Sequence, residues 1–68
     1  MAIWRVFFEK DGDPFCIKAP SCDIEGGALV FRGIDGALRE AHQTWFEVSR
    51  TQDNASYEYD VDEIEAAQ

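Results

Sequence analysis

The chain has 68 residues, a formal net charge of −8 and a hydrophobic content of 46%, with 13% aromatic residues. This length predicts a single domain over residues 1–68, and the hydrophobic content is typical of a globular rather than a disordered chain. No apolar run approaches the roughly 18–20 residues of a membrane span, and the N-terminus lacks the features of a signal peptide. We therefore expect a cytoplasmic protein that does not contact a membrane.

The first predicted elements form a β-hairpin. Residues 3–10 are rich in β-branched and aromatic side chains, and they predict a strand with large apolar groups on both faces. The Asp-Gly-Asp-Pro sequence at 11–14 predicts a turn, and residues 15–19 predict the returning strand. Pro20 then ends that strand or marks a bend.

Glycine turns divide the next part of the chain. Residues 21–25 continue in an extended conformation after the bend, and the two glycines at 26–27 predict a tight turn. Residues 28–32 predict a compact apolar strand, and the Gly-Ile-Asp-Gly sequence at 33–36 predicts another turn.

Residues 37–50 are compatible with two structures. Apolar residues recur at spacings of three, four and three from Leu38 to Val48, as they do along a helix. The first half of the segment also alternates, however, and its second half is rich in β-type residues. We favour two strands at 37–42 and 45–50, with a single helix as the alternative.

The last quarter of the chain is strongly acidic. Residues 51–68 carry six acidic and no basic residues, whereas residues 1–50 carry eight acidic and six basic ones. Such a field repels nucleic acid and favours a partner protein with a basic surface. Residues 56–61 predict a strand, and 62–68 predict a short helical turn.

Together these elements predict a mainly β fold of short strands separated by Gly, Pro and Asp turns. The fold class we expect is a small antiparallel sheet or an SH3-like partly closed barrel, with at most one helix, at 37–50 or in the C-terminal turn.

One long stretch of the sequence, GGALVFRGIDGALREAHQTWFEV, resembles a pattern in small uncharacterised β-rich proteins of phages and bacteria. In that pattern a glycine turn, an apolar strand, an Asp-Gly turn and a Trp-bearing strand follow one another. The resemblance covers roughly a third of the chain. It implies a β fold and a mobile-element origin, hence a location in the host cell. It implies no catalytic residue, because the shared motifs are structural.

The sequence carries no recognisable catalytic or cofactor motif. His42 is the only imidazole, and no nucleophile elbow or phosphate-binding glycine motif is present. Cys16 and Cys22 have a spacing that is unusual for zinc, so we interpret them as small buried apolar residues, with a disulfide or a metal site as alternatives. We expect no enzyme activity, no cofactor, no metal and no direct nucleic-acid binding.

The acidic stretch at 56–63 supports one functional hypothesis. In a strand, Glu58, Asp60 and Asp62 share one face and lie about 6.7 Å apart, close to the rise of about 6.8 Å over two nucleotide steps of a DNA strand. The acidic residues that extend this face are Asp53, Glu63 and Glu65. The row predicts a nucleic-acid mimic, such as a phage-encoded inhibitor of a host defence protein that binds nucleic acid. The alternative is an edge strand that is charged only to prevent aggregation.

A second hypothesis rests on the aromatic residues. A strand that is apolar on both faces needs a cover for each, which the C-terminal segment, a second copy or a partner can provide. The aromatic residues that we expect at such an interface are Trp4, Phe8, Trp45 and Phe46. They predict a structural or adaptor protein that forms a homodimer or binds another protein.

Overall fold

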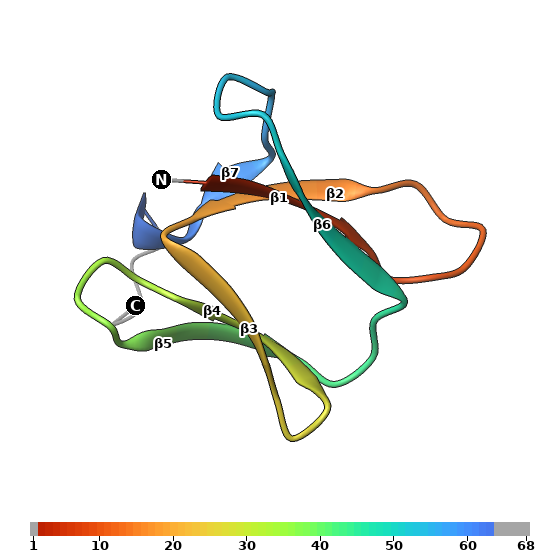
Figure 1. The fold of residues 1–68 in the computed structure, drawn as a ribbon, viewed down its shortest axis with the longest axis horizontal. Helices are drawn as coiled ribbons and strands as arrows, with labels where there is room; N and C mark the ends of the chain where they lie inside the picture. Colours follow the sequence, from red (N-terminus) through yellow and green to blue (C-terminus); the bar gives the residue numbers. More distant parts are fainter. Residues whose placement is uncertain (1, 64–68) are drawn as a thin grey trace.

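A computed structural model describes residues 2–63, and nearly all of its regular structure is β-strand (Figure 1). The elements are β1 (Ala2–Phe7), β2 (Phe15–Ala19), β3 (Ser21–Glu25), β4 (Ala28–Arg32), β5 (Leu38–His42), β6 (Glu47–Thr51), β7 (Tyr59–Asp60) and the 3₁₀ turn η1 (Val61–Glu63). The mainly β fold class predicted from the sequence is confirmed.

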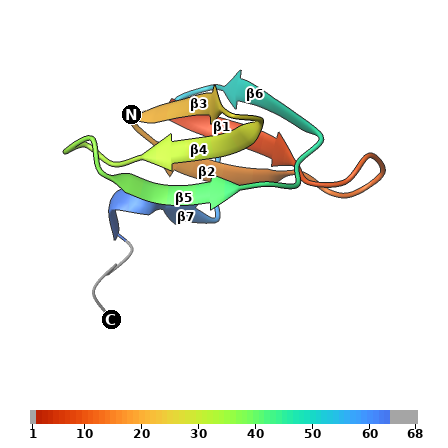
Figure 2. The same cartoon turned by 90° about the horizontal axis from the view of Figure 1, so that it is seen from below.

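The strands form two sheets that pack face to face (Figure 2). One sheet has the order β6-β1-β2-β7 and the other has the order β3-β4-β5. All strand pairs are antiparallel except β2 and β7, which are parallel. The chain passes from the first sheet to the second at Pro20, where the missing N–H group prevents a continuous strand ladder.

The core lies between the two sheets and draws on both of them. Its fully buried side chains are Val6, Ile17, Ala19, Leu29, Phe31 and Val61. Alternation along each strand explains this set, because every second residue of a strand points to the same face. The 3₁₀ turn contributes Val61, so the acidic end of the chain takes part in the core.

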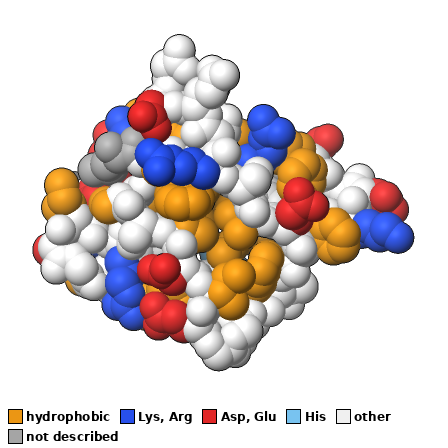
Figure 3. Space-filling model, in the orientation of Figure 1, with side chains coloured by type: hydrophobic (Ala, Val, Ile, Leu, Met, Phe, Trp, Pro, Cys, Tyr) orange, Lys and Arg blue, Asp and Glu red, His pale blue; other side chains and the backbone are white. Residues whose placement is uncertain are grey.

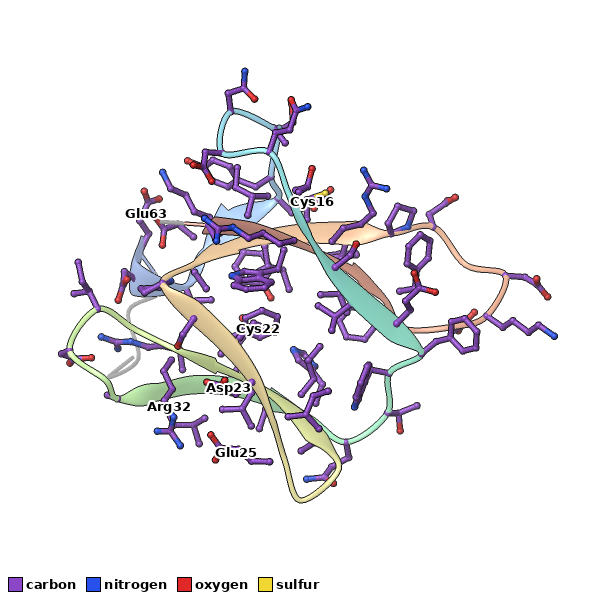
Figure 4. All side chains as sticks on the ribbon, viewed as in Figure 1. Cys16, Cys22, Asp23, Glu25, Arg32 and Glu63 are labelled. Atoms are coloured by element: carbon purple, nitrogen blue, oxygen red, sulfur yellow. The ribbon has the colours of Figure 1, made fainter. Side chains whose placement is uncertain are left out.

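β4 is also buried on its outer face. On that face Val30 lies between Arg32 and Glu25, whose side chains form an ion pair with 3.1 Å between Nη2 and Oε1. Figure 4 shows these two residues together with Asp23 outside this sheet. The pair covers Val30 with the aliphatic parts of two long side chains, which is a common use of such residues.

The segment 37–50 forms two strands, as predicted, and not a helix. These strands, β5 and β6, do not pair with each other. β5 pairs with β4, whereas β6 pairs with β1 in the other sheet. The strand predicted for 3–10 also ends earlier, at Phe7, because Gly12 N donates to Glu9 O and turns the chain there.

The strand predicted for 56–61 is wrong in extent. Only Tyr59 and Asp60 pair with β2, and the chain then enters η1. The reason is local, since the Asp60 carboxylate accepts a hydrogen bond from Asp62 N at 2.9 Å and thereby bends the backbone into a turn. The predicted helical turn at 62–68 lies mostly outside the described residues.

Candidate functional site

We call the two packed sheets together the barrel. On one side of it the outer strands of the two sheets are not joined. β3 and β6 are outer strands of different sheets, and no backbone hydrogen bond joins them. Both strands lie on the same side of the molecule in Figures 1 and 2. We call this side the seam, and we define it by β3, β6 and the side chains that point inward between them.

Two tryptophans form much of the seam. Trp4 and Trp45 are half-buried and pack against the core. Trp4 Nε1 donates to Ala19 O at 3.2 Å, and Trp45 Nε1 donates to Gly27 O at 3.0 Å. Because both indole N–H groups are used inside the molecule, the rings offer mainly apolar surface to a partner.

Isoleucine 24 completes the seam on the β3 side. Ile24 is opposite Leu29 in the strand pair and therefore shares its inward face, yet its side chain is 58% exposed. Val48 lies on the inward face of β6, opposite Val6. Figure 3 shows apolar side chains gathered at the centre of this face, between the two strands.

A second group of aromatic residues lies at one end of the barrel. We define this rim by Phe8, Phe15 and Phe46. The Phe8 and Phe15 rings are 6.0 Å apart in an edge-to-face arrangement. Phe46 N donates to Phe7 O at 2.7 Å, which holds Phe46 beside the end of β1. Phe15 and Phe46 remain 44% and 51% exposed.

The opposite side of the barrel is closed by polar contacts. Tyr59 Oη donates to Glu40 Oε1 at 2.7 Å, and His42 Nε2 lies 2.8 Å from the same oxygen. Burial raises the pKa of the Tyr59 phenol, and the hydrogen bond to Glu40 raises it further. The His42 ring also packs against Phe8 in a tilted arrangement, with 4.9 Å between ring centroids. This cluster ties β5 to β7.

The acidic residues of the predicted mimic do not form a row. Asp60 is only 5% exposed, and its carboxylate binds the backbone of η1. Asp62 accepts from Ile34 N at 3.1 Å, and Glu58 accepts from Cys16 N. The structure thus corrects the expected geometry, because these carboxylates satisfy backbone N–H groups of their own chain.

The remaining acidic residues of that prediction are Asp53, Glu63 and Glu65. Asp53 forms an exposed ion pair with Arg50, with 3.5 Å between Oδ1 and Nη2. Glu63 is exposed at the end of η1 (Figure 4). Glu65 lies outside the described residues.

Both cysteines are free and half-buried, so the disulfide alternative is not found. Burial raises the pKa of the Cys22 thiol to about 11, and the neighbouring Asp23 adds to this effect. Cys22 packs against the core from β3, in the manner of a small apolar residue.

The structure brings the predicted aromatic residues to two adjoining places. Trp4 and Trp45 lie in the seam, whereas Phe8 and Phe46 lie in the rim. Sequence reasoning missed the exposure of Ile24 and Phe15. Both occupy inward positions of their strands, so alternation alone predicts that they are buried.

No protein-family model, curated protein or solved structure matches the chain. Within residues 2–63, no group of three or more His, Cys, Asp or Glu side chains is arranged to hold a metal ion. The described part of the chain also contains no pocket and no helix long and apolar enough to cross a membrane.

Proposed function

We propose that the protein is a non-enzymatic protein-binding module and that the rim and seam form its binding surface. The observation that supports this most directly is the exposure of Phe15 and Phe46, 44% and 51%, beside two half-buried tryptophans. Aromatic residues are enriched at protein interfaces relative to the rest of the surface. Large aromatic side chains also supply most of the binding energy at such interfaces.

The charge of the chain favours a basic partner. At a net charge of −8, two copies of the protein repel each other, whereas a basic protein is attracted over a longer range. A nucleic-acid-binding protein of a host cell belongs to this class, and its inhibition by a phage-encoded protein stays a prediction. The net charge of the chain supports this prediction, and a row of carboxylates does not.

The experiment compares capture of partner proteins from a bacterial lysate by three tagged forms of the chain. The first is the natural sequence, and the second carries Phe15→Ser and Phe46→Ser. The third carries Ile34→Ser, a matched removal of an apolar side chain that is 77% exposed in the loop between β4 and β5. Captured proteins are identified by mass spectrometry.

We expect the rim variant to lose the partner and the Ile34 variant to keep it. The Ile34 variant is expected to unfold within about 0.5 kcal/mol of the natural protein, because its side chain is exposed. The rim variant is expected to stay folded but to lose about 1–2 kcal/mol, because Phe15 also contacts Phe8. Circular dichroism during thermal unfolding checks this. Equal capture by all three forms would contradict the proposal. Sedimentation equilibrium separates the alternative of a homodimer, since only a homodimer has twice the mass in the absence of lysate.

A further inference from the structure

We propose that the seam accepts an extended segment of the partner, which pairs with the free edge of β3 as an additional strand. This inference rests on the proposed protein-binding function and specifies its mode. Within residues 2–63, β3 pairs with β4 along one edge only, and none of its backbone groups bonds to β6. Its other edge therefore offers unpaired N–H and C=O groups, which are the usual template for strand addition.

The β3 edge is short and carries Asp23 and Glu25, but it lacks the other features that protect edge strands. Within Ser21–Glu25 there is no lysine and no proline, and the register shift of this sheet lies between β4 and β5 instead. Exposed edges are commonly protected by such residues or by bulges. The inward-pointing Ile24, 58% exposed, also has no protective purpose, because an apolar side chain at an edge promotes association.

The side chains of β3 define the segment that fits. Residues directly opposite in a strand pair share a face. Cys22 and Ile24 point inward, so the residues opposite them are apolar and contact the tryptophans of the seam. Asp23 and Glu25 point outward. Glu25 pairs with Arg32, whereas Asp23 has no ion-pair partner among the described residues, so the residue opposite Asp23 is basic. The expected segment thus alternates basic and apolar residues.

Charge disfavours two other arrangements, a homodimer through β3 and strand addition at β6. Two copies of β3 paired with each other would bring their outward carboxylates together, which opposes a homodimer through this edge. The edge of β6 is less suitable for this segment, because the charged Arg50 lies on its inward face, opposite Trp4, where the segment has apolar residues. β3 is therefore the strand on which the segment pairs.

The experiment uses the full chain, labelled with ¹⁵N, and a short synthetic peptide. The probe is acetyl-Lys-Val-Lys-Val-Lys-amide, and the matched control is acetyl-Lys-Lys-Val-Val-Lys-amide, which has the same composition without the alternation. Amide chemical shifts and hydrogen exchange are measured during titration. We expect the alternating peptide alone to shift the amides of β3 and to slow exchange along its outer edge.

Charge reversal on β3 sharpens this test. Asp23→Lys is expected to weaken binding of the alternating peptide by about threefold to tenfold, because a cross-strand attraction becomes a repulsion. Asp11→Lys changes the net charge equally but lies in the exposed turn between β1 and β2, and we expect it to leave most of the affinity. Equal weakening by both variants would show non-specific attraction and overturn the proposal.

Other outcomes would also overturn the proposal of strand addition at β3. Shifts confined to β6 or to the rim, or no binding of the peptide at millimolar concentration, would exclude strand addition at β3. The proposed function fails separately, when the Phe15 and Phe46 changes leave partner capture intact. Capture that depends on the rim, combined with no effect of peptide on β3, would keep the binding function and remove only its strand-addition mode.

Discussion

The two sides on which the sheets approach each other differ in how they are joined. On the side of β5 and β7, Glu40 links Tyr59 and His42, and Asp62 binds the backbone at Ile34. On the side of β3 and β6, two tryptophans and an exposed isoleucine take the place of such contacts. The acidic end of the chain therefore stabilises the fold on one side, whereas apolar side chains remain partly exposed on the other side.

The largest loss of stability is expected at Glu40, on the side of β5 and β7, which we call the closed side. Glu40→Ala leaves the Tyr59 hydroxyl and the His42 ring without their partner, so we expect a loss of about 2–3 kcal/mol in the free energy of unfolding. Glu47→Ala, an exposed glutamate of β6, is the matched control and should change it by less than about 0.5 kcal/mol. Urea denaturation measures both. Equal losses would show that the two sides do not differ in this way.

A smaller loss is expected at Gly33. A Cβ atom there would lie 2.5 Å from Asp62 Oδ1 and 2.6 Å from Arg39 Nε, and both side chains are held by other contacts. We expect Gly33→Ala to lower the free energy of unfolding by about 2 kcal/mol, as overpacking commonly does. Unfolding in urea, compared with that of the natural chain, measures the change. A loss below about 0.5 kcal/mol would mean that the contacts of the closed side adjust without energetic consequence.

On the side of the seam, which we call the open side, a smaller loss of stability is expected. Trp45→Phe removes the hydrogen bond to Gly27 O but keeps an aromatic ring in the seam. We expect a loss of about 1 kcal/mol in the free energy of unfolding and unchanged capture of the partner protein. Thermal unfolding and the lysate experiment test the two parts independently. Loss of capture without loss of stability would assign the indole N–H a direct role in binding.

The last prediction concerns alkaline pH. In the folded protein the Tyr59 phenol has a raised pKa because of burial and the contact with Glu40. Above the ordinary tyrosine pKa of about 10 the unfolded chain loses this proton while the folded chain keeps it, so stability falls as pH rises. We expect Tyr59→Phe to reduce the slope of unfolding free energy against pH above pH 10. Identical slopes for both proteins would contradict this.

Much of the fold follows from local sequence signals. The turns at Gly26–Gly27 and Gly33–Gly36 occur where the sequence predicts them, and Gly26 and Gly27 have the positive φ angles, 58° and 83°, that glycine adopts most easily. The first turn lies at 9–12, slightly before the predicted position at 11–14. The strands β1 and β4 could be predicted because β-branched and aromatic residues are frequent in them. Strand pairing is harder to predict from the sequence. Alternation indicates on which face of the sheet a side chain lies, but it does not indicate which strand is the neighbour.

The candidate site was only partly predictable for the same reason. Trp4, Phe8, Trp45 and Phe46 were recognised as interface residues from their type alone. Their division between seam and rim depends on β5 and β6 belonging to different sheets, which has no local signal. Phe15 was not recognised, because its exposure arises from its place at the end of the barrel.

The sequence by itself determined the β-rich architecture, the positions of the turns and the concentration of negative charge in the last quarter of the chain. These properties depend on residues close together in the chain and on their composition. Only the tertiary structure decided that Asp60 is buried while Ile24 is exposed. Both residues lie in alternating stretches that predict the reverse. A carboxylate is buried where backbone N–H groups need an acceptor, and an isoleucine stays exposed where the strand beside it is missing.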